Sequence, residues 1–203
     1  MSGGVVWLLV ALGLVAVVAR HRTIAVGVVT AQALVLVVVA LREAASGEEV
    51  AAAFALGLRA LALAALFLVV VARTREPRPF RSNARPLVRG SLAVGLALAL
   101  TWLIPDVGLT SRVAERGVLA LIAFGVVTVA TRRATLLQVI GIVLVENGLA
   151  LAALGLPGES SLVIELGVAL DLMLIAVVAA IFHERIFAEF GAGDTDLLRS
   201  LRD

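Results

Sequence analysis

Charged side chains inside apolar segments are the residues of this chain that point most directly to chemistry. Glu146, Glu165 and Asp171 lie in two long apolar segments, and Arg59 lies in a third. A charge at the centre of a bilayer costs about 3 kcal/mol on insertion scales, so charges that spanning does not need suggest a function. Burial favours the neutral form of a carboxyl group, and a nearby arginine favours the ionised form. A carboxylate held between these effects can bind and release a proton, so we predict proton or ion handling within a membrane.

The depth of each charge follows from the rise of an α-helix. Arg59 lies about 20 Å from the cytoplasmic end of its segment, Glu146 and Asp171 about 18 Å, and Glu165 about 27 Å. Glu165 and Asp171 are separated by roughly 120° around one helix, so they cannot face the same neighbour. One arrangement points Asp171 towards Glu146 or Arg59 and points Glu165 at a different helix. The polar side chains that could hold bridging water are Gln32, Thr128, Gln138 and Asn147.

A structural alternative exists for the same charges. Arg59 could form a fixed ion pair with Glu146 or Asp171 that locks helices together. Glu165 has no charged residue at its own depth, which favours a functional role for it. The remaining acids are expected to be solvated loop residues, namely Glu43, Glu48, Glu49, Glu76, Glu115 and Glu159.

The composition limits the class of protein and its cofactors. Hydrophobic residues make up 62% of the 203 residues and the mean hydropathy is +1.11, which predicts an integral membrane protein. Cysteine is absent, which excludes disulfides, thiolate chemistry and cysteine-held iron–sulfur clusters within this chain. His21 and His183 lie at segment ends beside arginines, so we expect no metal, haem or other cofactor in this chain.

Seven apolar runs predict an all-α integral membrane protein with about seven transmembrane helices. The first, fourth and fifth runs are short for a bilayer, so we expect them to extend into their flanks or to lie where the protein thins the membrane. The runs cover residues 5–19, 23–41, 50–72, 91–104, 117–130, 134–154 and 161–183.

The arginines are distributed unevenly between successive connections. The connections after the first, third and fifth runs, and the tail, are rich in arginine, whereas the others hold few arginines and several acids. Because positive residues are retained in the cytoplasm, we predict an N-terminus outside and a C-terminus in the cytoplasm, which requires an odd number of spans. All 17 basic residues are arginines, and no basic surface interleaved with aromatic residues supports a nucleic-acid partner.

The longest connection, residues 73–90, divides the chain. Pro77, Pro79 and Pro86 forbid a continuous helix there. Two interpretations remain open for this connection: a solvated cytoplasmic loop that touches lipid headgroups, or a docking segment for a partner protein. The predicted parts are a three-helix part over 1–90 with an arginine-rich cytoplasmic loop, a four-helix part over 91–190, and a short cytoplasmic tail over 191–203.

The last third of the chain resembles a known membrane protein family. The resemblance is carried by Arg132-Arg133, the run QVIGIVLVENG at 138–148, the run ELGVALD at 165–171 and the tail DTDLLRSLR at 194–202. These residues resemble hydrogenase-4 component E. The last three predicted helices are also similar to the small three-helix subunit K of complex I and to its counterpart in multisubunit cation/proton antiporters. Both of these small proteins have an acid in each of their last two helices.

The resemblance implies roles for individual residues. Glu165 matches the second acid of the subunit K pattern, and Glu146 lies about one helical turn from the first, where this chain has Val143. Asp171 belongs to the hydrogenase-type pattern. Arg59 lies in the N-terminal part, where subunit K offers no comparison.

The resemblance also implies a membrane-arm subunit of a redox-driven, complex I-related hydrogenase complex in a bacterial or archaeal cell (inner) membrane. Its partners would be antiporter-like and other membrane subunits, together with lipid, and hydrophilic subunits would hold the redox centres. Glu146, Glu165 and Asp171 would form a proton or cation path tuned by Arg59, and the chain would not be catalytic alone. The alternative is a structural scaffold that bridges antiporter-like subunits. An autonomous transporter is disfavoured because the two halves show no evident inverted repeat.

Overall fold

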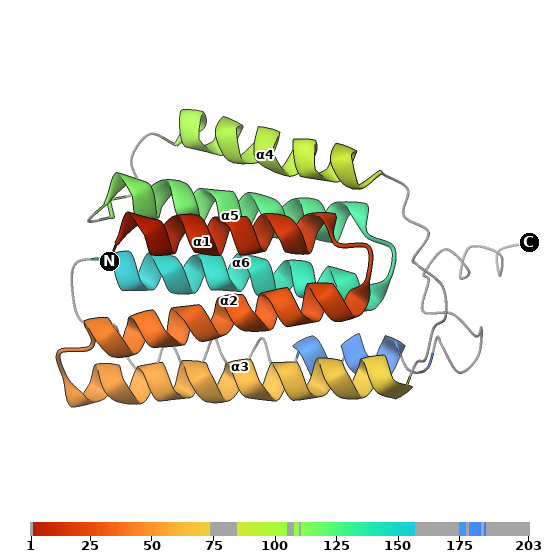
Figure 1. Ribbon diagram of the computed structural model, residues 1–203, viewed down its shortest axis with the longest axis horizontal. Coiled ribbons are helices and arrows are strands. Elements are labelled where there is room, and N and C mark those ends of the chain that lie inside the picture. The colour runs from red at the N-terminus through yellow and green to blue at the C-terminus, as the bar shows by residue number, and fades with distance from the viewer. Residues whose placement is uncertain are drawn as a thin grey trace, which may run out of the picture.

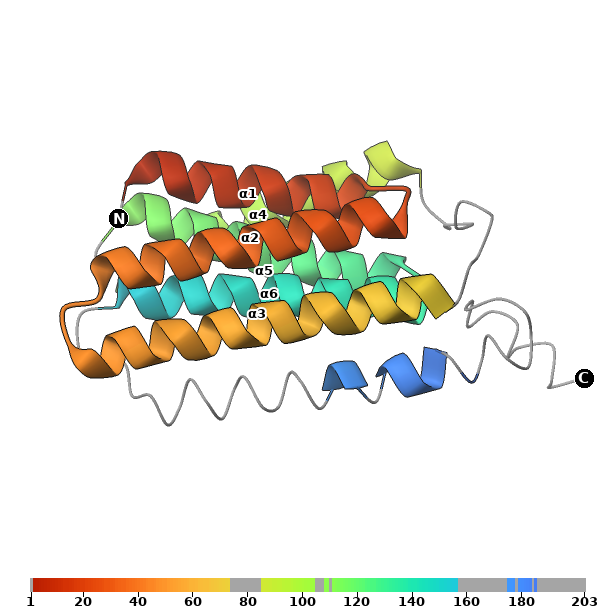
Figure 2. The same ribbon diagram turned by 60° about the horizontal axis from the view of Figure 1, so that its bottom comes forward.

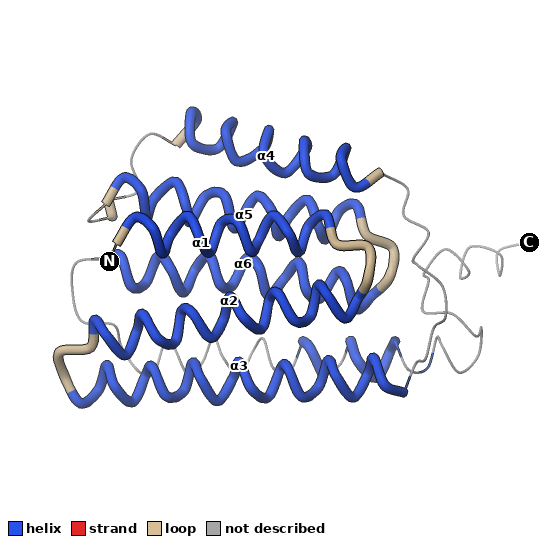
Figure 3. The backbone as a smooth tube through the Cα atoms, viewed as in Figure 1, coloured by secondary structure: helices blue, strands red, loops and turns tan. Residues whose placement is uncertain are grey.

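The computed structural model describes residues 2–73, 85–104, 108–109, 111–156, 175–177, 179–183 and 185. These residues are almost entirely helical, so the prediction of an all-α protein is confirmed for them (Figures 1 and 3). Five of the helices, α2 to α6, are long and apolar enough to cross a membrane, and α1 is a shorter apolar helix. The helices are α1 (Gly3–Val18), α2 (Arg22–Glu43), α3 (Gly47–Arg73), α4 (Pro86–Leu103), α5 (Arg112–Thr131) and α6 (Thr135–Gly155).

The first six apolar runs each form one helix, and the two short runs in the middle of the chain extend at their N-terminal ends. α4 has 18 residues and α5 has 20. The connection predicted over 73–90 is therefore too long, because Pro86 occupies the first turn of α4, where proline needs no hydrogen-bond donor. The solvated loop position predicted for Glu115 is also wrong, because this residue lies buried in the first turn of α5.

The seventh predicted run lies mostly outside the described residues. Its last part, at 175–177, 179–183 and 185, is helical. Figure 2 shows this stretch in blue beside α3. Its residue His183 lines a small cavity together with Phe67 of α3 and Val139 of α6. The predicted tail over 191–203 lies outside the described part of the chain.

The six helices run in alternating directions along one long axis (Figure 1). α1, α2, α5 and α6 form the centre, with α5 packed against α6 and α2 packed against both α1 and α6. α3 packs against α2 on one edge, and α4 packs against α5 and α1 on the other. α2 thus packs against both α3 and α6, and a side chain that links α3 to α6 passes beside α2.

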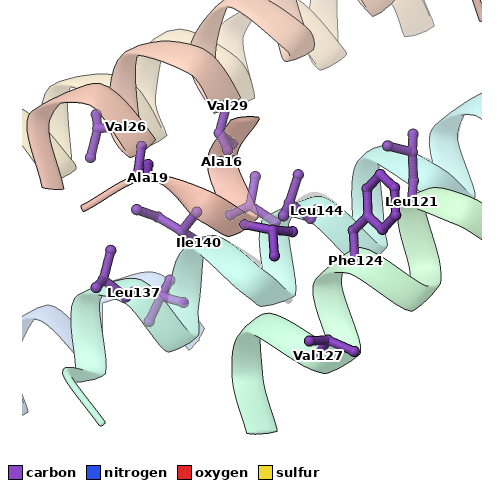
Figure 4. Close-up of a cluster of buried hydrophobic side chains, with 14 of the residues drawn as sticks. Ala16, Ala19, Val26, Val29, Leu121, Phe124, Val127, Leu137, Ile140 and Leu144 are labelled. Carbon is purple, nitrogen blue, oxygen red and sulfur yellow. The ribbon is translucent and has the colours of Figure 1, made fainter. Parts of the chain in front are cut away.

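The core lies between the central helices. Figure 4 shows Val29 of α2, Phe124 of α5 and Leu144 of α6 directed into one buried cluster. α5 and α6 approach until their backbones touch, since a Cβ built at Gly125 would lie 2.5 Å from the carbonyl oxygen of Gly141. In lipid no hydrophobic effect drives helices together. Helices therefore associate largely through van der Waals contacts, which close approach increases.

The two ends of the bundle differ in charge. The end that holds the α1–α2 and α5–α6 connections carries arginine, and the opposite end carries acids as well as arginine (Figure 1). At the acidic end the backbone N–H of Glu49 donates to Ser46 Oγ at 3.2 Å, which caps α3. Described charged residues at the first end are Arg20, Arg22, Arg73, Arg85, Arg89, Arg132, Arg133 and Arg185. Those at the second end are Arg42, Glu43, Glu48, Glu49, Arg112, Glu115 and Arg116.

Candidate functional site

A buried ion pair joins the middle of α3 to the middle of α6. Nη1 of Arg59 donates a hydrogen bond to Oε1 of Glu146. The side chains are 7% and 9% exposed, respectively. The two charges that sequence counting put at one depth therefore meet in the bundle.

Helical spacing explains why both side chains point inward. On α3, Arg59 shares a buried face with Leu63 and Phe67, which follow at intervals of four residues. On α6, Glu146 shares a buried face with Val143, three residues earlier. Each charge is thus one polar group beside apolar side chains on the buried face of its own helix.

A second polar chain runs beside the ion pair through three helices. Asn147 Nδ2 of α6 donates to Gln32 Oε1 of α2 at 2.8 Å. Gln32 Nε2 in turn donates to the backbone oxygen of Leu9 in α1, also at 2.8 Å. Both side-chain amides are fully buried. Because Asn147 follows Glu146 directly in the sequence, the amide chain and the ion pair lie next to each other on neighbouring faces of α6.

A small cavity adjoins both groups. It has a volume of about 10 Å³, and its lining includes Arg59, Asn147 and Thr30. Such a volume is roughly the least that holds one water molecule. Within the described part of the chain, Asn147 Oδ1 accepts no hydrogen bond. Because Asn147 and Arg59 both line this cavity, it borders both the amide chain and the ion pair.

The other predicted site residues fall elsewhere. Thr128 Oγ1 donates to the backbone oxygen of Phe124 in its own helix at 2.7 Å. Gln138 Nε2 donates to the backbone oxygen of Arg132 at 2.9 Å and so holds the α5–α6 connection. Glu165 and Asp171 lie outside the described residues. Of the four predicted polar supports, Asn147 therefore lies beside the ion pair, and Gln32 is linked to it through Asn147.

Among the described residues, five buried polar side chains were not predicted as site candidates, namely those of Arg22, Arg89, Glu115, Arg132 and His183. Glu115 is 4% exposed, Arg132 is 4% exposed and His183 is 1% exposed. Each lies at the end of an apolar run, where hydropathy alone suggests solvent. A helical continuation of the apolar face, with Glu115 four residues before Leu119, is the signal that could have found Glu115.

Arg132 has a defined structural task. Its Nη2 donates to the backbone oxygens of Val17, at 2.9 Å, and of Ala19, which satisfies carbonyl groups at the C-terminal end of α1. Burial, and secondly the positive charge of Arg89, lower the pKa of Arg132 to about 10. The guanidinium therefore stays protonated at neutral pH, and its charge is retained close to a second arginine.

Glu146 is the one titratable carboxyl group of this ion pair. Among the residues that the structure describes, no group of three His, Cys, Asp or Glu side chains is placed to hold a metal ion. A carboxylate paired with a guanidinium offers one protonation site. The neighbouring amides can donate and accept hydrogen bonds but do not titrate.

Comparison with known proteins gives one relative over most of the chain. A Mycobacterium tuberculosis protein described as "Uncharacterized protein Rv0085" is 33% identical over 166 residues, which cover 75% of this chain and 74% of that protein. No family model matches the chain, and no solved structure matches it.

Proposed function

The chain belongs to the same family as the Mycobacterium tuberculosis protein Rv0085, and we propose that it is a membrane-arm subunit of a redox-driven, complex I-related hydrogenase complex. Glu146 would contribute a protonation site to a proton or cation path, together with Glu165 and Asp171. Arg59 would set the balance between the two protonation states of Glu146. Antiporter-like membrane subunits would be the partners, and the chain itself would carry no electrons.

The observation that supports the proposal is the Arg59–Glu146 pair with its polar surroundings. An ionised carboxylate is costly in an apolar bundle, and the guanidinium offsets that cost. The amide chain through Gln32 and Asn147, with the adjoining cavity, gives polar contacts on the side next to Glu146. Together these groups provide a titratable site and the beginning of a polar route away from it.

A structural scaffold is the second candidate function, and the direct contact of the two charges favours it. An ion pair between α3 and α6 can lock the two helices without any proton transfer. In this case the chain would bridge antiporter-like neighbours, and exchanging the charges of Arg59 and Glu146 would leave its function unchanged. The two functions therefore differ in whether the carboxyl group itself is required.

Substitution of the carboxyl group separates the two functions. The complex is isolated in mild detergent, the co-purifying proteins are identified, and proton movement is measured in sealed membrane vesicles after addition of an electron donor. We expect Glu146→Gln to assemble with a less stable bundle and to lower coupled proton movement. Glu165→Gln should lower coupled proton movement while the assembly is kept. Glu48→Gln is the matched control, because Glu48 is exposed at the end of the bundle.

The exchange of the two charges supplies the opposite test. The double variant Arg59→Glu, Glu146→Arg keeps an ion pair but moves the carboxylate to α3. The scaffold function predicts full assembly and full coupling in this variant, whereas the proton-path function predicts assembly with impaired coupling. Full coupling in both Glu146→Gln and the exchanged variant would contradict the proton-path proposal.

We also propose seven spans, with the N-terminus outside and the C-terminus in the cytoplasm. Because the chain has no cysteine, single cysteines report topology without background labelling. Ser46 and His21 are exposed at opposite ends of α2. In intact cells a membrane-impermeant maleimide should label Ser46→Cys and leave His21→Cys unlabelled until the membrane is opened. The reverse pattern would contradict the proposed orientation.

A further inference from the structure

The small cavity beside the ion pair has a lining of two kinds. Its residues come from α2, α3 and α6, which pack around it through α2. Most of the lining is apolar and buried, as at Leu63 of α3 and Val143 of α6. The polar part consists of Thr30, Arg59 and Asn147. The cavity therefore places three polar side chains around one small volume in the apolar middle of the bundle.

The amide oxygen of Asn147 is a buried acceptor with capacity to spare. Asn147 is fully buried, and its Nδ2 group donates to Gln32 Oε1 at 2.8 Å. No residue that the structure describes donates a hydrogen bond to Asn147 Oδ1. Most buried acceptors are paired with a protein donor or with an ordered water, because an unpaired one is costly in an apolar interior. This oxygen therefore points to a ligand that can donate a hydrogen bond.

The chain of amides determines that the spare atom is the oxygen. The backbone oxygen of Leu9 can only accept, so Gln32 must present its Nε2 group to Leu9. Gln32 Oε1 then faces Asn147, which must present its Nδ2 group in turn. Rotating either amide by half a turn would bring two acceptors together. Asn147 Oδ1 is thus fixed as the atom that is left for a further donor.

The size of the cavity limits the ligand to a very small molecule. Its volume of about 10 Å³ is roughly that of one water-sized probe, and buried waters form two to four hydrogen bonds. Asn147 Oδ1 can accept one of these bonds, and the hydroxyl group of Thr30 can donate or accept another. The positive guanidinium group of Arg59 attracts the oxygen end of a water dipole. Size and polarity therefore agree on the same ligand.

We propose that this cavity binds one water molecule, which donates a hydrogen bond to Asn147 Oδ1 and forms a second with Thr30 Oγ1. The water joins α2 to α6 on the side of the cavity that borders Arg59. This inference goes beyond the proposed function, because the water is bound whether the ion pair transfers protons or only joins two helices.

A sodium ion is the main competitor for such a cavity, since hard cations also bind amide and hydroxyl oxygens. Of the two charges in the ion pair, it is the positive Arg59 that lines the cavity. A cation at this distance from a guanidinium group is repelled, and the apolar surroundings screen the repulsion little. Water carries no net charge, so the cavity should select water over sodium.

X-ray radiolysis of the detergent-purified protein, read by mass spectrometry, tests the proposal. The X-ray pulse makes hydroxyl radicals from water, and the radicals oxidise the side chains that the water contacts. We expect oxidation of Leu63, which lines the cavity although it is buried, and none of Leu36, which is equally buried in the apolar core. When ¹⁸O-water is mixed in just before the pulse, Leu63 should still gain ¹⁶O, because a bound water exchanges slowly with the bulk.

Two variants connect this oxidation to the polar groups. Thr30→Val keeps the shape of the side chain and should lower the oxidation of Leu63, and Asn147→Leu should abolish it. Thr101→Val is the matched control, because the Thr101 hydroxyl donates to a backbone oxygen of its own helix at 2.8 Å on α4, and it should change nothing. Should Asn147→Leu fold poorly, since it also removes the bond to Gln32, Thr30→Val still decides the matter.

Three results would overturn the proposal. Oxidation of Leu63 no faster than that of Leu36 would mean that the cavity is dry. Unchanged oxidation in Thr30→Val would mean that the water, if any, is not held by these groups. Oxidation of Leu63 that is suppressed by sodium chloride but not by the chloride of a bulky organic cation would assign the cavity to sodium.

Discussion

Neutralising one or both members of the Arg59–Glu146 pair should give strongly non-additive changes in stability. Both side chains are less than a tenth exposed, so solvent and salt screen their attraction little. Two unit charges 4 Å apart attract by about 4 kcal/mol at an effective dielectric constant of 20. Removing one member leaves the other as an uncompensated buried charge, which costs about 3–5 kcal/mol, whereas removing both is often close to neutral.

A double-mutant cycle measures this coupling. The four proteins are the parent, Arg59→Gln, Glu146→Gln and the double variant, and the free energy of unfolding is obtained in mixed micelles from the loss of helical circular dichroism. We expect each single variant to lose about 3–5 kcal/mol and the double variant to lose far less than the sum. Arg42→Gln with Glu48→Gln forms the control cycle, because both residues are exposed, and its coupling should stay below about 0.5 kcal/mol.

Additive losses would refute the reasoning. A coupling energy at Arg59 and Glu146 no larger than in the control cycle would mean that the two groups are not a charged pair in the folded protein. A small loss in Glu146→Gln alone would mean that Glu146 is already neutral, since an amide would then replace a carboxylic acid at little cost. Either result would remove the basis for the proposed proton site.

Further changes test the packing and the polar chain. Gly125→Ala should destabilise the bundle by about 1–3 kcal/mol, because its Cβ would lie 2.5 Å from a carbonyl oxygen of α6. Gly95→Ala should be neutral or slightly stabilising by thermal unfolding, because no atom lies within 4 Å of its added Cβ. Gln32→Leu should cost about 1–2 kcal/mol, since it breaks two buried hydrogen bonds. Arg132→Gln should speed amide hydrogen exchange in the last turn of α1, as read by mass spectrometry, because it removes the bonds to the carbonyl groups there.

The helices could be predicted from the sequence to within a few residues because apolar runs of membrane length are strong signals. The starts of α4 and α5 could not. Charged residues stand just before the two apolar runs, namely Arg89, Arg112, Glu115 and Arg116. The first turn of a helix tolerates such residues, because its backbone N–H groups have no partner within the helix. Hydropathy reports burial in lipid, whereas the helix ends are set by hydrogen bonding and by Pro86.

The membrane depth of the candidate site residues could be predicted, but the direction of their side chains could be predicted only in part. Residue counting put Arg59 and Glu146 at one level, because every helical residue adds the same rise. It could not separate Gln32 and Asn147, which join the polar chain, from Thr128, which bonds to its own helix. In a helix that is apolar on all sides, no hydrophobic stripe fixes which face turns inward. Rotation about each helix axis is determined by packing, as at Gly125 between α5 and α6.

The ion pair also sets a condition on any proton path through Glu146. When Glu146 binds a proton, Arg59 keeps its charge and loses this counterion, at a cost comparable to removing the partner, about 3–5 kcal/mol. The amides of Gln32 and Asn147 can offer Arg59 a dipole but no negative charge. In the proposed path, a second carboxylate near the guanidinium would therefore favour proton uptake at Glu146. The sequence puts Asp171 at the depth of Arg59, so we propose Asp171 as the acid that receives the guanidinium when Glu146 binds a proton.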